Sequence, residues 1–333
     1  MRIYFNTNAD CIKSPSARLW FYQMCDNLLE RNIHADLNEM GPVPYDIAII
    51  HWARSDAIQQ VLKHSPNAHI GVLNPGPLGL GLKKSIANKL KSKSELQSVL
   101  KKTDFFIVTS FVWRDLLLPY GKRIYLTIDY EKPEVRSVKQ HSEDNNLIIG
   151  YHGSPNHFKN DFFPYGANAL KRLAREFNLT LHVVTRKVHK QPSIKGIPTR
   201  YIEFDLSIFH DEIQKFDIGL CPALSACTDL SDPLKYIRNP NRVNTLLFYG
   251  IPSVTSPIPQ ACHDLCDGET ALFAVTEEGW YQALRKLIVN PDLRNRIGNA
   301  GRKMVEKRFS EKAATDLFLK MLDDELKQPV CQK

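Results

Sequence analysis

The feature that most constrains this chain is a repeated alternation of short apolar runs with stretches of helical periodicity. The run YDIAII at 45–50 is nearly continuous in its hydrophobicity, as in a strand that helices cover on both faces. Before it, Trp20, Met24 and Leu28 recur at the four-residue spacing of an amphipathic helix. This alternation predicts a parallel sheet with helices on both faces.

The alternation occurs twice along the chain, on either side of a polar stretch. The stretch at 125–146 contains a proline and no periodicity, so it is predicted to be a linker. After it we expect a strand in NLIIGY and a helix from about Asp161 to Phe177, and later strands in LTLHVV, RYIEF, DIGLCP and IPSVTS. The predicted fold class is α/β, with two Rossmann-like doubly wound domains facing across a cleft. The expected boundaries are residues 1–140, 141–310 and 311–333, the last a helix that crosses back to the amino-terminal domain.

Composition fits two globular cores and excludes several classes of protein. The chain has 333 residues, of which 43% are hydrophobic, which is enough for two domains and excludes a disordered chain. Its seven cysteines form no CxxC pair, which indicates a reduced cytosolic protein. Cys262, His263 and Cys266 fit no common zinc spacing, so no metal is expected. The sequence contains neither a signal peptide nor an apolar stretch that could cross a bilayer.

A first candidate for anion binding is the loop GYHGSPNHFK, which follows the expected strand NLIIGY. Gly153 and Ser154 allow backbone amides to approach a ligand, and His157 and Lys159 add hydrogen-bond donors. The loop is a plausible phosphate cradle. A solvated polar loop is the alternative.

A second candidate is the basic stretch at 232–254. Lys235, Arg238 and Arg242 precede a helix expected at about 242–249. Cations before a helix oppose its dipole, so an anionic partner such as a diphosphate would relieve the conflict. A solvated basic loop is again the alternative.

Several segments, in order along nearly the whole chain, resemble one enzyme family. In the carboxyl half these are FDIGLCP, NPNRVNTLLFYGIPSV, GETALFAV and NPDLRNRIGNAGRKMVEKRFS, and in the amino half YDIAIIHW, TDFFIVTS and LTID. Together they are similar to GT-B glycosyltransferases, especially those of family 4.

The resemblance implies transfer of a sugar, with retention, from a nucleotide-diphospho-sugar to a glycan or lipid-linked acceptor. The donor is a substrate, so no cofactor is implied. The carboxyl-terminal domain would bind the donor and the amino-terminal domain the acceptor, in synthesis of a cell-surface polysaccharide or glycolipid. Two alternatives stay open, a nucleotide-sugar epimerase on the same fold and a non-catalytic module that binds a nucleotide sugar or glycan.

The resemblance also implies roles for individual residues. Lys159 matches the family lysine that holds the donor diphosphate. His51 matches the family histidine after a sheet strand and, with Asn74 at the place of a later His-Asp pair, is the candidate for a catalytic role.

One family motif is replaced in this sequence. The family's paired glutamates fall on Ile237 and Thr245, so both carboxylates are absent, and Asp229 or Asp232 is a candidate substitute. We include Asn241 and Thr245 among the expected donor-binding residues.

The segment 78–102 has seven lysines and one acid, Glu95. It would be attracted to anionic lipid head groups, which predicts a cytoplasmic protein in peripheral contact with the inner face of the plasma membrane. An ordinary surface helix is the alternative. Nucleic acid is not an expected partner, because stacking aromatic residues are not interleaved with the lysines. The sequence does not indicate an oligomeric state.

Overall fold

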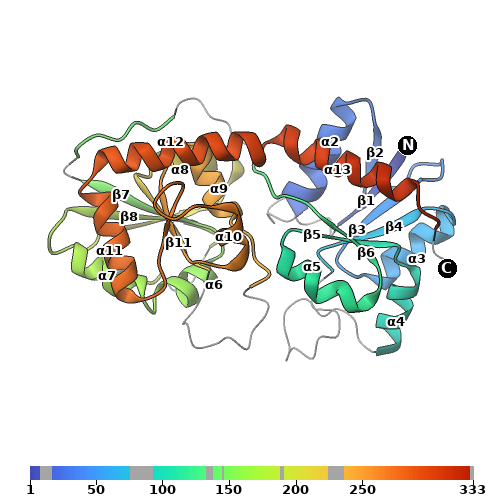
Figure 1. Cartoon of the computed structure of the whole chain (residues 1–333), viewed down its shortest axis with the longest axis horizontal. Coiled ribbons are helices and arrows are strands. Elements are labelled where there is room, and N and C mark those ends of the chain that lie inside the picture. Colours follow the sequence, from blue (N-terminus) through green and yellow to red (C-terminus); the bar gives the residue numbers. More distant parts are fainter. Residues whose placement is uncertain are drawn as a thin grey trace. The chain divides into compact units, whose positions relative to one another are not determined.

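The computed structural model describes residues 1–7, 17–75, 93–132, 138–144, 146–187, 191–223 and 236–330. The chain divides into two compact units. Unit 1 comprises residues 1–130 together with 311–333, and unit 2 comprises residues 131–310 (Figure 1). The chain therefore returns to unit 1 after completing unit 2.

Unit 1 contains a six-stranded parallel sheet in the order β2-β1-β3-β4-β5-β6. The strands alternate with helices along the chain, as the apolar runs predict. The strands are β1 (Arg2–Asn6), β2 (His34–Leu37), β3 (Ile47–His51), β4 (His69–Leu73), β5 (Phe105–Val108) and β6 (Arg123–Leu126). The helices are η2 (Arg18–Tyr22), α2 (Gln23–Glu30), α3 (Ser55–His64), α4 (Lys93–Lys102), α5 (Phe111–Leu117), η3 (Leu118–Tyr120) and α13 (Glu311–Leu326).

Both faces of this sheet are covered, which explains why every residue of β3 is buried and why its first four residues are apolar. Helices α3, α4 and α5 pack on one face. Helices α2 and α13 pack on the other, where Phe318 of α13 stacks on Phe5 of β1. Residues of α13 and β1 therefore belong to the same hydrophobic core.

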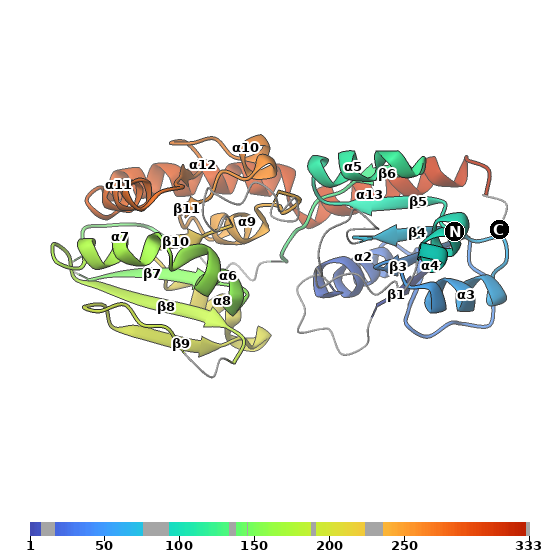
Figure 2. The same ribbon diagram turned by 90° about the horizontal axis from the view of Figure 1, so that it is seen from below.

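Unit 2 contains a second six-stranded parallel sheet in the order β12-β11-β10-β7-β8-β9; Figure 2 shows β7, β8 and β9 side by side. The strands are β7 (Leu147–His152), β8 (Leu179–Thr185), β9 (Thr199–Glu203), β10 (Ile218–Cys221), β11 (Ser253–Thr255) and β12 (Leu272–Phe273). The helices are α6 (Pro155–His157), η4 (Phe158–Phe162), α7 (Gly166–Leu173), α8 (Leu206–Gln214), α9 (Asn241–Phe248), α10 (Pro259–Asp264), α11 (Glu277–Ile288) and α12 (Pro291–Arg308).

One helix of unit 2 departs from the sequence expectation. The helix expected from about Asp161 to Phe177 is interrupted, because Pro164 lies between η4 and α7 and cannot continue a hydrogen-bonded helix. Asn290 caps α12, since its Oδ1 accepts a hydrogen bond from the amide of Leu293 at 2.8 Å. In unit 1, the polar stretch expected as a linker from residue 125 begins within β6.

Candidate functional site

The strand order of unit 2 places a switch point between β7 and β10. From β7 the chain builds the sheet in one direction through β8 and β9, then returns to the other side of β7 with β10 and β11. Loops leaving β7 and β10 therefore diverge, and in such sheets the carboxyl ends at this point form a crevice for ligands. The polar residues described next all lie at this edge.

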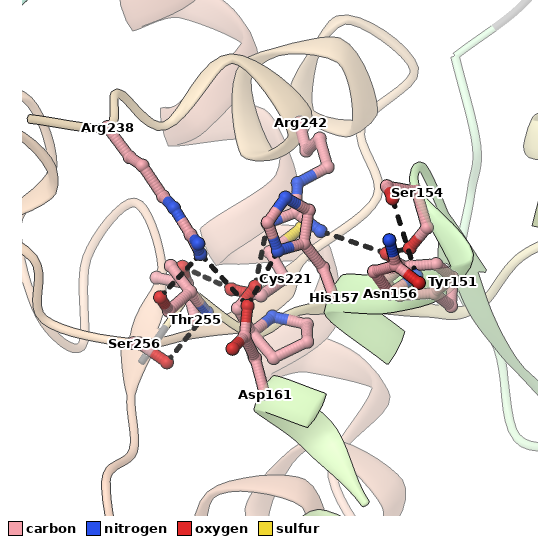
Figure 3. Close-up of polar contacts among 12 residues, drawn as sticks. Tyr151, Ser154, Asn156, His157, Asp161, Cys221, Arg238, Arg242, Thr255 and Ser256 are labelled. Carbon is pink, nitrogen blue, oxygen red and sulfur yellow. Dashed lines mark hydrogen bonds and ion pairs between the residues drawn. The ribbon is translucent and has the colours of Figure 1, made fainter. Parts of the chain in front are cut away.

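Arg242, in the first turn of α9, points toward the end of β7 (Figure 3). Its guanidinium donates hydrogen bonds to the Tyr151 hydroxyl at 3.3 Å and to the Pro222 carbonyl oxygen at 2.7 Å, and lies over the Tyr151 ring. Gly153 follows β7 with a φ of 131°, a conformation that favours glycine. A Cβ at Gly153 would lie 3.0 Å from Cδ of Arg242, so the absent side chain leaves room for the arginine.

Arg238, in the loop before α9, approaches the same edge. Its Nη1 donates to Oδ2 of Asp161 at 2.9 Å and to the Ala223 carbonyl oxygen at 2.8 Å. The same Asp161 oxygen accepts a hydrogen bond from Nδ1 of His157 at 2.7 Å. We call His157, Asp161, Arg238 and Arg242 the basic cluster; Figure 3 shows their side chains converging.

Exposure separates the carboxylate of the basic cluster from the two groups that donate to it. The Asp161 side chain is 4% exposed, whereas the side chains of His157 and Arg238 are 33% and 28% exposed. The negative group is thus more deeply buried than its two donors. An anion arriving from solvent would meet the Arg238 guanidinium before the Asp161 carboxylate.

The electrostatics of the basic cluster determine its protonation. Burial raises the pKa of Asp161, but the hydrogen bond from His157 and the charge of Arg238 outweigh it and hold the pKa below the ordinary value. The hydrogen bond to Asp161 raises the pKa of His157, but burial and the charges of Arg242 and Arg238 outweigh that bond and lower the pKa. At neutral pH, Asp161 is therefore ionised and His157 neutral. Burial raises the pKa of Tyr151 to about 12, so its hydroxyl is neutral as well.

The structure brings together five of the expected donor-binding residues, namely Gly153, Ser154, His157, Arg238 and Arg242. Ser154 has a structural use there, since its Oγ accepts a hydrogen bond from the amide of Asn156 and caps α6. Lys159 is exposed and lies outside the basic cluster. It is two residues from both His157 and Asp161, and helical residues with that spacing do not face each other.

The other two expected donor-binding residues lie on α9. Asn241 is its first residue, and the Thr245 hydroxyl donates to the Asn241 carbonyl oxygen at 3.0 Å. Thr245 is buried, so its hydroxyl is used inside the helix. Lys235, Asp229 and Asp232 lie outside the described residues.

Sequence reasoning missed Asp161 and Tyr151. The signal for Asp161 was available, because His157 and Asp161 have the i, i+4 spacing at which helical side chains meet. Tyr151 is the last residue of the expected strand NLIIGY, one residue before the end of β7, and offered no such signal.

The expected catalytic residues of unit 1 lie at the carboxyl ends of its own strands. His51 ends β3 and is buried, with Nδ1 hydrogen-bonded to the Thr7 hydroxyl after β1 at 2.8 Å. β1 and β3 flank the switch point of this sheet. Trp52 and Asn74, which follow β3 and β4, have φ values of 62° and 48°. Positive φ costs a bulky residue such as tryptophan energy, and such strain is concentrated at functional sites.

Most of the lysine-rich segment falls outside the described residues, which resume at α4. No helix of the described chain is long and apolar enough to cross a membrane. In the same residues, no three His, Cys, Asp or Glu side chains are grouped so that they could hold a metal ion.

The fold, in contrast to the sequence, is similar to that of known proteins. No protein-family model matches the chain, and no curated protein matches it in sequence. Among solved structures, sucrose-phosphate synthase from Thermosynechococcus elongatus is 12% identical with a TM-score of 0.70, over 97% of this chain and 98% of that chain. HepE from Anabaena, solved in complex with UDP, is 10% identical with a TM-score of 0.66, over 97% and 100%. A glycosyltransferase from Rickettsia africae is 13% identical with a TM-score of 0.66, over 98% and 99%.

These matches confirm the expected fold class. Each unit is a Rossmann-like doubly wound domain, and two such domains in one chain are the components of the GT-B fold.

Proposed function

We propose that this protein is a glycosyltransferase that uses a nucleotide-diphospho-sugar, with the basic cluster holding the donor diphosphate. The observation that supports this most is the convergence of Arg238 and Arg242 at the switch point of unit 2. Two arginines and one ionised carboxylate leave a net positive charge there, which suits an anion. HepE, which has the same fold, has also been solved with UDP-glucose.

The chemistry asks the basic cluster mainly to stabilise negative charge. When the bond between sugar and diphosphate breaks, the leaving group gains charge, and fixed donors nearby lower the barrier without having to reorganise. Arg238 and Arg242 are fixed in this way, because each also donates to a backbone carbonyl oxygen. Transfer with retention requires no strong base if the leaving diphosphate accepts the proton of the acceptor hydroxyl.

Acceptor binding is assigned by the same proposal to unit 1, with His51 and Asn74 as candidate catalytic residues. His51→Ala is expected to lower turnover more than donor affinity. Equal loss of both would indicate a structural role, which the burial of His51 also allows.

The donor is tested by calorimetric titration with UDP-glucose, GDP-mannose and ADP-glucose. At least one is expected to bind, and Arg238→Ala and Arg242→Ala are each expected to weaken it by about tenfold or more, because each removes a charged hydrogen-bond donor. Arg285→Ala on α11 is the control. It removes the same charge from a surface ion pair with Glu176 and should leave affinity unchanged.

The products separate the candidate functions. Release of nucleoside diphosphate with a new glycoside supports the glycosyltransferase, and the anomeric signals of that glycoside in an NMR spectrum report whether configuration is retained. Isomerisation of the sugar without an acceptor would indicate the epimerase. Tight binding without turnover would indicate the non-catalytic module.

A lipid-linked acceptor and contact with an anionic membrane belong to the same proposal. Replacing Lys83, Lys84, Lys91 and Lys93 with glutamine is expected to reduce binding to phosphatidylglycerol vesicles at low salt, because each lysine contributes about 1 kcal/mol. Unchanged vesicle binding would leave the segment as ordinary surface.

A further inference from the structure

The basic cluster contains an arrangement that its proposed role in holding a diphosphate does not require. One oxygen of Asp161 accepts hydrogen bonds from both His157 and Arg238. Asp161 thereby places a carboxylate, which repels anions, beside the two arginines of the basic cluster. A site selected only for positive charge would have no use for this group, so its function must lie in what it does to its two partners.

Asp161 fixes which nitrogen of His157 bears the proton. An ionised carboxylate only accepts hydrogen bonds, so Nδ1 of His157, at 2.7 Å, must be the donor. Neutral His157 then has its lone pair on Nε2. In the described part of the chain, Nε2 has no hydrogen-bond partner, and the side chain is one-third exposed. A proton from solvent can therefore add at Nε2 without breaking any contact recorded for His157.

The electrostatic environment of His157 reverses when an anion binds. The charged or titratable groups facing it are Asp161 on η4, Arg238 in the loop before α9, and Arg242 on α9. The neutral Tyr151 hydroxyl lies beyond Arg242. The two arginines repel a proton on His157 before an anion binds, and a doubly charged diphosphate would neutralise both of them. Protonated His157 would then be paired with Asp161 on one side and with phosphate on the other.

We propose that Asp161 is a positioning residue that makes His157 take up a proton when a diphosphate binds. The new bond is N–H at Nε2, the proton comes from solvent, and nothing is oxidised or reduced. Protonated Nε2 of His157 then donates to the diphosphate, in addition to Arg238 and Arg242, and this third donor exists only when the anion is bound. This inference rests on the proposed function, because it assumes that a diphosphate occupies the basic cluster.

The pH dependence has a definite sign. The pKa of free His157 lies below its ordinary value. An anion bound to the two arginines would raise this pKa, because it removes their repulsion of the proton. Between the free and bound pKa values, affinity is expected to rise as pH falls, by up to about tenfold per pH unit for one proton. Above the bound pKa and below the free pKa, affinity should not depend on the titration of His157.

The experiment measures proton uptake directly. Wild-type protein is titrated at pH 7 with UDP-glucose, GDP-mannose and ADP-glucose in non-phosphate buffers with different heats of ionisation, and the dependence of the binding heat on the buffer gives the number of protons taken up. These nucleotide sugars have no ionisation near neutrality in their diphosphates, so uptake belongs to the protein. We expect more than about half a proton per bound molecule.

Variants assign the proton and the positioning role. His157→Gln should abolish the uptake. Asp161→Asn, which keeps the size but not the charge, should also abolish it and reduce affinity by about tenfold, whereas Asp161→Glu should restore part of both. His182→Gln is the matched control: His182 is a buried histidine on β8 whose pKa burial likewise lowers, and its replacement should leave the uptake intact. Circular dichroism melting curves check that each variant is folded.

The outcomes distinguish the two proposals. If none of the nucleotide sugars binds the wild-type protein, both the proposed function and this inference are overturned. If one binds without proton uptake, or if Asp161→Asn retains the full uptake, only the role of Asp161 and His157 is overturned.

Discussion

At the scale of single residues, Gly153 connects backbone conformation to the position of a cation. Its amide donates to the Val184 carbonyl oxygen at 3.1 Å, and its own carbonyl oxygen accepts from the Thr185 hydroxyl at 2.7 Å. The turn after β7 is therefore fixed by β8 on one side, while Arg242 occupies the space where a side chain would be. The position of Arg242 therefore depends on the conformation of the backbone at Gly153.

Replacing Gly153 with alanine tests this coupling. The variant is expected to lose about 1–3 kcal/mol of unfolding free energy, because an L side chain is strained at that φ. It is also expected to bind the donor more weakly, because the new Cβ displaces Arg242. Urea unfolding and calorimetric titration with UDP-glucose measure the two effects. Gly121→Ala is the control, since Gly121 also has a positive φ of 63°, but a Cβ added there would meet no atom within 4 Å. It should lower stability alone; a matching loss of affinity would argue against the coupling.

The hydrogen-bond donors of the basic cluster were candidates in the sequence, whereas their shared acceptor, Asp161, was not. Local spacing pointed to His157, Arg238 and Arg242, because each lies close to an expected strand end or helix start. Asp161 and Arg238 are 77 residues apart, and only folding brings them together. Lys159 matches a family motif by position, yet the helical repeat directs it away from its neighbours His157 and Asp161.

At the scale of elements, α13 is held to unit 1 by a buried carboxylate as well as by apolar packing. Glu325 is fully buried, and it accepts hydrogen bonds from Arg123 at the start of β6 and from Tyr125, while His69 at the start of β4 lies 3.0 Å from it. These partners lower the pKa of Glu325 against the opposing effect of burial, which is the largest single contribution.

Glu325→Gln is expected to destabilise unit 1 by roughly 3 kcal/mol, because it leaves Arg123 without its buried partner. In the wild type, the lowered pKa means that this stabilisation is present above the ordinary pKa of glutamate and is lost as pH falls through the folded value. Urea unfolding at pH 7 and pH 4 should therefore show a difference between wild type and variant that shrinks in acid. A difference independent of pH would contradict the assignment to the carboxylate.

Elements with strong periodicity were predictable, and those defined by tertiary packing were not. The apolar runs identified β3, β7 and β8. Strand β2, with the sequence HADL, is short and polar, and it is a strand because it pairs with β1. Pro164 causes the break between η4 and α7. Packing also favours the break, because the Phe162 ring lies against Gly166, where a Cβ would be only 1.9 Å from the ring.

At the scale of the whole molecule, the chain length and the repeated alternation of apolar runs with helical periodicity were sufficient to predict two domains. Each unit buries its own set of apolar residues, so each leaves its own pattern in the sequence. The return of the chain to unit 1 was suggested in sequence only by a helix after residue 310. In the structure that helix contributes Ala314, Phe318, Met321 and Leu322 to the core of unit 1.

Truncation after Ser310 is therefore expected to unfold unit 1 while unit 2 persists. Burying Phe318, Met321 and Leu322 contributes about 2 kcal/mol each. The sum of about 6 kcal/mol is comparable to the usual stability of a domain, which is about 5–15 kcal/mol. Limited proteolysis should digest residues 1–130 rapidly and leave a protected fragment near residues 131–310. Equal protection of both regions would show that α13 is dispensable.

The same return of the chain sets an order of events during synthesis. The first strand leaves the ribosome before unit 2, but the α13 residues that close its core are translated only after the whole of unit 2. The middle of the chain holds all of unit 2 and can fold while translation continues. Until α13 emerges, apolar residues of unit 1 lack part of their packing, so a newly made chain is expected to need chaperones during this interval.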